Sequence, residues 1–189
     1  YKVLARILQE RLEEVVEAKI RPSQFGFRKD RSTQQPIHVA RRLQHLTDQK
    51  GNKLFMLFLD WEKAFDKIEP KALLKALRRH RINEDFVRVI EAIYHSPKFQ
   101  VRDGQHTSQP ERAYTGIRQG CPLSPYLFLL VHSAVMWDVQ KDIEEEQGTL
   151  PYVHSANRPL FDLAYADDTL ILARSAQTTE TVLRAVQRR

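Results

Sequence analysis

Residues 163–173 read LAYADDTLILA and place two adjacent carboxylates, Asp167 and Asp168, between apolar runs. The apolar arms predict two strands, at about residues 160–166 and 169–173, joined by a turn that carries the acids. Asp is a common turn residue, so a plain polar turn is one interpretation. Neither Gly nor Asn is present, however, for the positive φ that a tight hairpin turn usually requires. Two ionised carboxylates held together repel each other, and a bound divalent cation would relieve that repulsion.

A third acid, Asp60, stands at the end of another apolar run. Residues 53–60 read KLFMLFLD, a near-continuous apolar sequence that predicts a strand buried on both faces. Asp60 could instead be the N-cap of a helix over the following residues, WEKAFD. If the strands that carry Asp60, Asp167 and Asp168 converge on one sheet edge, their carboxylates form the oxygen-ligand set that Mg²⁺ prefers. Water and substrate phosphates would then complete the coordination of the ion.

The remaining patterns predict a mixture of helices and strands. Apolar residues at helical spacing predict a helix over residues 2–19, and the pair Asp103-Gly104 predicts a hairpin within residues 99–108. The strands come from distant parts of the chain, which indicates an α+β fold. Further helices are predicted to begin at Ser32 or Thr33 with a hydroxyl cap and Pro36 in the first turn, at Pro70, after Asn83, and at Ser124-Pro125.

Composition limits the class of protein. The 189 residues include 30 Lys and Arg against 24 Asp and Glu, a net charge of +6 that leans toward an anionic partner such as nucleic acid. The single cysteine excludes an internal disulfide or a Cys-rich zinc site. We therefore expect no disulfide-linked partner and an intracellular location, in the nucleus, the cytoplasm or both. The longest apolar run, LFMLFL, has six residues, so no membrane partner is expected. Helical patterns run to both ends of the sequence, and we expect a segment of a longer chain.

Four stretches, in this order and spacing, carry a resemblance to a known family. The segments FLDWEKAFDKI (58–68), GIRQGCPLSPYLF (116–128) and AYADDTLIL (164–172) resemble successive motifs of reverse transcriptases. The upstream segment RPSQFGFRKDRST (21–33) resembles the loop that precedes these motifs in the non-LTR (LINE-like) retrotransposon branch and its group II intron relatives. The resemblance covers about residues 1–173. It implies the fingers–palm portion of a right-hand polymerase, with an antiparallel palm sheet backed by helices and the thumb absent.

The resemblance also implies an activity and a division of the chain. Residues 1–53 would form a fingers-like helical and basic segment, and residues 54–189 the catalytic palm segment, of one truncated reverse transcriptase domain. The implied enzyme is the RNA-directed DNA polymerase of a non-LTR retrotransposon, which adds dNTPs to a primer 3′ hydroxyl by two-metal phosphoryl transfer. Its partners would be an RNA template and a DNA primer, and its cofactors two Mg²⁺ ions, or Mn²⁺ in their place. Because the family's primer grip and thumb would lie beyond Arg189, we expect the segment alone to be weakly active or inactive.

The metal and sugar sites are carried over from the matching motifs. Asp60, Asp167 and Asp168 match the metal-binding catalytic carboxylates, and the carbonyl of Trp61 matches an additional metal ligand. Phe65 matches the steric gate, whose bulk would clash with the 2′ hydroxyl of a ribonucleotide. The alternative for Phe65 is a plain core aromatic residue.

Further positions match the nucleotide-binding part of the family. Gln119 matches the residue that touches the incoming nucleotide, and Gly120, with Gly116, would let the backbone approach the base pair closely. Tyr165 would pack beneath the template–primer, next to the carboxylates. The segment RQGCPLSP can also be a loop that starts a helix, and both roles are compatible.

Basic residues supply the candidates for contact with nucleic acid. Arg28, Lys29 and Arg31 form a cluster that could reach the template backbone or the triphosphate, and Arg118 is a further candidate. The alternative is a solvated basic loop.

Two other functions are compatible with the same motifs. One is a group II intron-type maturase, which also binds structured intron RNA. The other is a decayed element that retains only a nucleic-acid-binding fold. An RNA-templated RNA polymerase is disfavoured, because that class usually carries Gly before its paired aspartates, where this chain has Tyr165 and Ala166.

Overall fold

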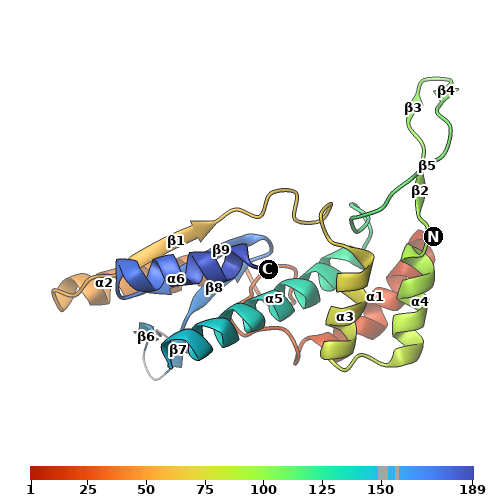
Figure 1. Ribbon diagram of the computed structural model, residues 1–189. Coiled ribbons are helices and arrows are strands. Elements are labelled where there is room, and N and C mark those ends of the chain that lie inside the picture. The colour runs from red at the N-terminus through yellow and green to blue at the C-terminus, as the bar shows by residue number, and fades with distance from the viewer. Residues whose placement is uncertain (149–152, 156–157) are drawn as a thin grey trace. The chain divides into compact units, whose positions relative to one another are not determined.

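The chain forms helices and short antiparallel strands, as Figure 1 shows for the computed structural model. The structure describes residues 1–148, 153–155 and 158–189. The predicted α+β class is confirmed. None of the helices in these described ranges is long and apolar enough to cross a membrane.

Contacts within the chain divide it into two units, which are described separately. Helix α5 (Ser124–Gln147) begins in one unit and continues in the other. The predicted boundary between residues 53 and 54 stays a prediction. The helical unit comprises Tyr1–Val15 and Lys63–Val131, and the sheet unit comprises Val16–Glu62 and His132–Arg189.

A three-stranded antiparallel sheet forms the centre of the sheet unit. Its strands stand in the order β1-β9-β8, so β9 is central and pairs with both neighbours. Leu59 lies opposite Thr169, and Tyr165 lies opposite Asp168. The three strands predicted to carry the acids are therefore present and adjacent. The strands of the unit are β1 (Phe55–Leu59), β8 (Asp162–Tyr165) and β9 (Asp168–Ala173), with β6 (Val153–Ser155) and β7 (Arg158–Leu160) in a separate ribbon.

Helices pack on both faces of this sheet. Helix α6 (Ala176–Gln187) and the later part of α5 pack on one face, where Ile171 is fully buried. Helix α2 (Gln34–Gln49) packs on the other face, where its Leu43 shares a core with Leu172. Successive side chains of a strand point to opposite faces, so β9 contributes to both cores.

The prediction that β1 is buried on both faces is wrong. Phe58 is 75% exposed, although it stands near the end of the apolar run. Met56, which lies on the same face, packs into the core beneath α2. Helix α2 therefore packs over the start of the strand. On this face of the sheet, it leaves Phe58, near the end of the strand that leads to Asp60, open to solvent.

The predicted hydroxyl cap of α2 is also wrong. The helix begins at Gln34, and the preceding Thr33 already has helical φ and ψ of −60° and −27°, with no side-chain cap hydrogen bond. Instead, Oε1 of Gln35 accepts a hydrogen bond from the backbone N–H of Ser32 at 3.1 Å. This bond resembles one half of a capping box, in which a side chain reaches back to an N–H at the helix start. Pro36 lies in the first turn, as predicted.

The helical unit contains three helices and the first part of α5. Helix α4 begins after Asn83, as predicted, and Oδ1 of Asn83 accepts a hydrogen bond from the backbone N–H of Asp85 at 2.8 Å. The residues that follow Asp60 form turns rather than a helix, so the N-cap interpretation of Asp60 is wrong. The helices are α1 (Lys2–Val16), which ends earlier than predicted, α3 (Pro70–Arg79) and α4 (Glu84–Tyr94).

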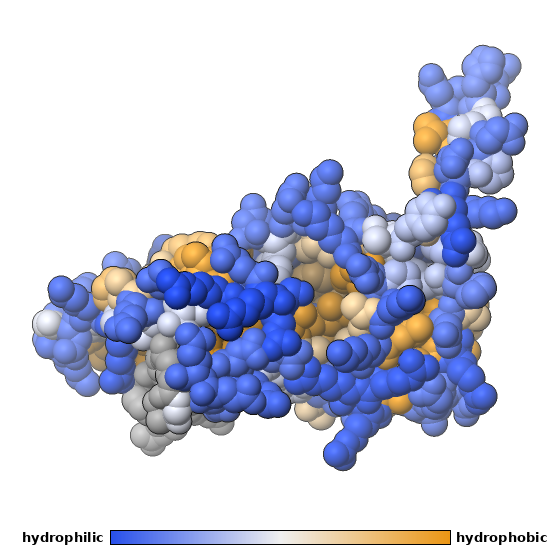
Figure 2. All heavy atoms as spheres, viewed as in Figure 1, coloured by the Kyte–Doolittle hydropathy of each residue, from blue (hydrophilic) through white to orange (hydrophobic). Residues whose placement is uncertain are grey.

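A hairpin follows α4 and extends away from the helices of its unit (Figure 1). Asp103 pairs with His106, so the turn begins at Gly104, whose φ is 56°. The predicted hairpin is confirmed, with Asp103 in the strand. Figure 2 shows hydrophobic side chains among hydrophilic ones on this segment, where Phe99 and Val101 are 52% and 61% exposed. Its strands pair as β2 (Lys98–Phe99) with β5 (Glu111–Arg112) and β3 (Arg102–Asp103) with β4 (His106–Thr107).

Candidate active site

Asp60 and Asp168 lie opposite each other at one end of the three-stranded sheet. Leu59, the last residue of β1, pairs with Thr169, so the next residue, Asp60, is in register with Asp168. Residues directly opposite on antiparallel strands have Cβ atoms about 5 Å apart. Both residues are exposed, so ions and substrate can reach their carboxylates.

Asp167 lies in the two-residue turn that joins β8 to β9. Tyr165 pairs with Asp168, which leaves Ala166 and Asp167 as the turn. The missing Gly or Asn argued against a tight turn, but the structure forms one by placing Ala166 at a φ of 56°. A Cβ makes this left-handed conformation costly, and such strained residues cluster at functional sites. The paired acids therefore stand on a strained turn at the end of a packed sheet.

A groove runs beside the acids on the sheet face that carries Phe58. It has a volume of about 580 Å³ and is lined mainly by apolar side chains from the three strands and the start of α2. Asp60 and Asp168 line it together with the aromatic rings of Phe58 and Tyr165, whereas Asp167 does not line it. Apolar surface with a few convergent polar groups is typical of a ligand site.

On the opposite face, the hydroxyl of Thr169 connects the two acid-bearing segments. It accepts a hydrogen bond from the indole N–H of Trp61 at 3.1 Å and donates to the carbonyl of Asp167 at 3.2 Å. Nε2 of His132, on α5, lies 3.0 Å from the same hydroxyl. Burial lowers the pKa of His132 to about 4, so its ring is neutral at pH 7. The residue after Asp60 and the turn residue Asp167 are thus tied to one hydroxyl.

The donor set fits a metal ion that the substrate helps to hold. Within residues 1–148, 153–155 and 158–189, no group of three or more His, Cys, Asp or Glu is arranged to hold a metal ion. Mg²⁺ commonly takes only one or two protein carboxylates, with substrate phosphates and water as its other ligands. Asp60 and Asp168 provide such a pair.

Phe65 belongs to the helical unit and packs there against another aromatic residue. Its ring is stacked on that of Phe128 at a centroid distance of 4.9 Å and an interplanar angle of 12°. Its carbonyl accepts a hydrogen bond from the backbone N–H of Ile117 at 2.8 Å. The ring is only partly buried. This packing accounts for the position of the ring, and its role as a steric gate stays a prediction.

The loop that carries Gln119 is fixed to the segment that carries Phe65. Nε2 of Gln119 donates a hydrogen bond to Oδ1 of Asp66 at 2.8 Å. Gly116 has a φ of 93°, and a Cβ there would stand 3.0 Å from the carbonyl oxygen of Asp66, so glycine is required. Gly120 also has a positive φ, 72°. The guanidinium of Arg118, in the same loop, lies 4.3 Å from the ring centroid of Tyr1. The nucleotide roles of these residues stay predictions.

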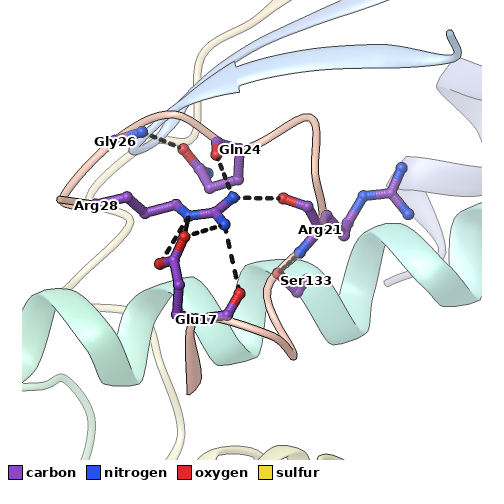
Figure 3. A network of polar contacts seen from close by, with 6 residues as sticks. All are labelled: Glu17, Arg21, Gln24, Gly26, Arg28 and Ser133. Carbon is purple, nitrogen blue, oxygen red and sulfur yellow. Dashed lines mark hydrogen bonds and ion pairs between the residues drawn. The ribbon is translucent and has the colours of Figure 1, made fainter. Parts of the chain in front are cut away.

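The basic cluster of the sheet unit divides into two kinds of residue. The side chain of Arg28 is only 5% exposed and pairs with Glu17, and it also donates to backbone carbonyls of its own loop (Figure 3). Lys29 and Arg31 are exposed, and the guanidinium of Arg31 lies 5.4 Å from the ring centroid of Phe25. The geometry therefore favours a structural role for Arg28 and leaves Lys29 and Arg31 as candidates for nucleic-acid contact.

Sequence analysis missed two groups that support the acids. Gln24 and Gly26 contact the turn at Ala166, and Arg21 forms a buried ion pair with Asp162 on β8. The only signal was the place of Arg21, Gln24 and Gly26 in the segment RPSQFGFRKDRST, of which only the basic residues Arg28, Lys29 and Arg31 are predicted site residues.

Comparison with known proteins shows the family to which the chain belongs. The family model described as "Reverse transcriptase (RNA-dependent DNA polymerase)" matches residues 1–189. The chain belongs to the reverse transcriptase family. The predicted membership is confirmed.

Similar proteins come from retrotransposons. The "Transposon TX1 uncharacterized 149 kDa protein" of Xenopus laevis is 28% identical to this reverse transcriptase chain over 174 residues, or 92% of the chain and 13% of that protein. The "Retrovirus-related Pol polyprotein from type-1 retrotransposable element R2" of Nasonia vitripennis is 30% identical over 134 residues, or 71% of the chain and 12% of that protein. The chain thus spans about an eighth of the length of these relatives. Their similarity to the chain confirms the predicted resemblance to the non-LTR retrotransposon branch.

Solved structures support the fold. Telomerase from Candida albicans, in complex with a fragment of telomeric RNA, is similar with a TM-score of 0.64 at 14% identity, over 96% of this chain and 30% of that chain. Apo telomerase from Candida tropicalis is similar with a TM-score of 0.64 at 11% identity, over 97% of this chain and 33% of that chain. The similarity agrees with the predicted fingers–palm fold of a reverse transcriptase.

Proposed function

We propose that this chain is the catalytic part of the RNA-directed DNA polymerase of a non-LTR retrotransposon. The observation that carries the proposal is the register that sets Asp60 opposite Asp168 at an open sheet end, in a chain of the reverse transcriptase family. The enzyme would add dNTPs to the 3′ hydroxyl of a DNA primer on an RNA template. The single cysteine supports an intracellular location, in the nucleus or cytoplasm.

Three carboxylates would hold two divalent ions, Mg²⁺ or Mn²⁺. Asp60 and Asp168 supply exposed oxygens in the groove, and Asp167 and the carbonyl of Trp61 are the further ligands that the motif suggests. When bound, such ions activate a hydroxyl nucleophile and stabilise the charge of a leaving pyrophosphate. The sheet holds the acids in place before the substrate arrives, because the Thr169 hydroxyl ties Trp61 to Asp167.

The surroundings of the acids suit a nucleic acid. Phe58, which is 75% exposed, and Tyr165 give the groove aromatic surface on which a sugar or base can pack. Exposed Lys29 and Arg31 supply positive charge for phosphates, and the chain as a whole carries +6. These features support an RNA template and a DNA primer as partners.

Primer extension by the full-length protein that contains this chain tests the proposal. With an RNA template, an annealed DNA primer, dNTPs and Mg²⁺, we expect template-dependent products. The Asp167→Asn/Asp168→Asn double variant should extend the primer at least about 10³-fold more slowly. The proposal fails if the two proteins extend equally, or if the wild type adds no dNTP with either Mg²⁺ or Mn²⁺.

A second experiment tests the sugar selectivity assigned to Phe65. If its ring blocks the 2′ hydroxyl, Phe65→Ala should raise the incorporation of rNTP relative to dNTP by about 10- to 100-fold, the size of effect that pocket shape can supply. The ratio is the useful measurement, because loss of the stack on Phe128 also lowers stability.

Phe128→Leu is the matched control for that experiment. It removes the stacking partner of Phe65 and leaves the Phe65 ring in place. We expect lower stability with an unchanged ratio of rNTP to dNTP incorporation. If both variants change the ratio equally, or neither changes it, Phe65 is a packing residue only.

A further inference from the structure

One buried side chain holds the strained turn of the carboxylates. Gln24 is 1% exposed. Its Oε1 accepts a hydrogen bond from the backbone N–H of Ala166 at 2.9 Å, and its Nε2 donates to the carbonyl of Ala166 at 2.9 Å. Both backbone polar groups of the left-handed residue are therefore bound by a single amide.

The loop that carries Gln24 is in close backbone contact with the turn at Ala166. A Cβ on Gly26 would stand 2.1 Å from the backbone nitrogen of Ala166, a distance that real Cβ atoms do not show. The N–H of Gly26 donates to Oε1 of Gln24 at 2.8 Å, which orients the amide (Figure 3). Glycine at position 26 is thus a condition for the contact between loop and turn.

The same loop is bonded along the edge of β8. The backbone N–H of Phe25 donates to the carbonyl of Ala164 at 2.7 Å, and the N–H of Ala164 donates to the carbonyl of Ser23 at 2.9 Å. Further along β8, Oγ of Ser23 donates to Asp162 at 2.9 Å. Residues 23–25 therefore form an isolated parallel bridge to β8, which brings Gln24 to the turn.

Arg28 fixes the backbone from which Gln24 projects. Figure 3 shows its guanidinium at the centre of the loop, where it donates to the carbonyl of Gln24 at 2.8 Å and to the carbonyl of Arg21 at 3.1 Å. Its Nε lies 3.1 Å from each carboxylate oxygen of Glu17. Charge-assisted and bidentate bonds of this kind are the strong ones. The support of the turn thus runs from Glu17 through Arg28 to Gln24.

We propose that Gln24 is a positioning residue for the metal-binding carboxylates. Its amide holds Ala166 in the left-handed conformation, and that conformation sets the directions in which Asp167 and Asp168 leave the turn. The physical need is clear, because a residue with a Cβ resists this conformation and buried hydrogen bonds offset the resistance. This inference rests on the proposed polymerase function, but it can be tested without turnover.

Gln24→Met in the full-length protein is the main test, since it keeps the length of the side chain and removes its polar atoms. We expect kcat for primer extension to fall about 10- to 100-fold, with the KM for dNTP within about threefold of the wild type. We also expect Mn²⁺, followed by electron paramagnetic resonance without nucleotide, to bind about tenfold more weakly. Gln49→Met is the matched control, because Gln49 is exposed at the end of α2, and it should change neither value.

The rescue variant separates positioning from folding. Ala166→Gly in the Gln24→Met background should restore Mn²⁺ affinity and much of kcat, because glycine adopts a positive φ without a Cβ. A residue needed only for folding would lower the melting temperature and show no such rescue. The inference is overturned if Gln24→Met leaves Mn²⁺ affinity unchanged, or if Ala166→Gly restores nothing. A wild type that binds Mn²⁺ but adds no dNTP would instead contradict the proposed function and leave the metal-binding result to decide the role of Gln24.

Discussion

Asp60→Asn is expected to lower the rate of primer extension by about 10³-fold or more, while the free energy of unfolding stays unchanged or rises. The rate falls because Asp60 and Asp168, opposite each other in the groove, would share the task of holding a divalent ion. Loss of one carboxylate removes charge that stabilises the bound ion. Stability does not fall, because Asp60 is exposed and its neighbour Asp168 carries the same charge. Removal of one of two like charges relieves repulsion in the protein without metal.

The measurement needs rate and stability from the same preparation. Single-turnover extension gives the rate of chemistry, and urea unfolding without divalent ions gives the free energy. Asp48→Asn is the control, because Asp48 is an exposed acid of α2 in the same unit and does not line the groove. It should leave both quantities within experimental error. A rate within tenfold of the wild type for Asp60→Asn, or a loss of several kcal/mol of stability, would mean that Asp60 does not hold the ion.

The sequence was informative about the strands and uninformative about the turn between two of them. Apolar runs located β1, β8 and β9, because a strand that packs in a core needs apolar side chains. The absence of Gly and Asn between the last two argued against a tight turn, yet Ala166 adopts the left-handed conformation. The bonds from Gln24 come from a loop far away in the sequence, so local propensity could not reveal them.

The exposure of Phe58 shows a related limit. A run such as LFMLFL is typical of a strand buried on both faces, and Met56 and Leu57 follow that pattern. How far α2 extends over the sheet decides which residues of β1 it covers. The sequence of the strand itself does not encode that length. An apolar residue left open beside the acids is what a binding groove requires, so the failed prediction falls at the candidate site.

Charge was a poor guide to role in the upstream loop. Arg28, Lys29 and Arg31 are equivalent in a count of charges, but the side chain of Arg28 is buried and bonds to Glu17 and to its own loop. A guanidinium has five donors in a fixed fork, so it can bind several carbonyls at once. Which arginine of a cluster does so depends on the path of the backbone and not on the local sequence.

The largest loss of stability is expected from Asp162→Ala, at about 3–5 kcal/mol. Asp162 and Arg21 form an ion pair whose side chains are 2% and 6% exposed. Without the carboxylate, the guanidinium would stay buried with only the 2.8 Å bond to Gln140 as its other side-chain partner among the described contacts. The hydroxyl of Ser23 would lose its acceptor as well. An uncompensated buried charge costs far more than the pair itself contributes.

Two further variants test whether the penalty comes from the unpaired charge. Glu180→Ala removes an acid whose pair with Arg184 on α6 has both side chains 62% exposed, and it should cost less than about 1 kcal/mol. The double variant Arg21→Met/Asp162→Leu replaces both charges by apolar side chains, and it should recover a large part of the stability lost by Asp162→Ala. Urea midpoints with an unchanged dependence on denaturant give the comparison. If Asp162→Ala costs no more than Glu180→Ala, the pair does not fasten the loop to β8, and the loop that supports the carboxylate turn must be held by its other bonds, such as those to Ala164 and Ala166.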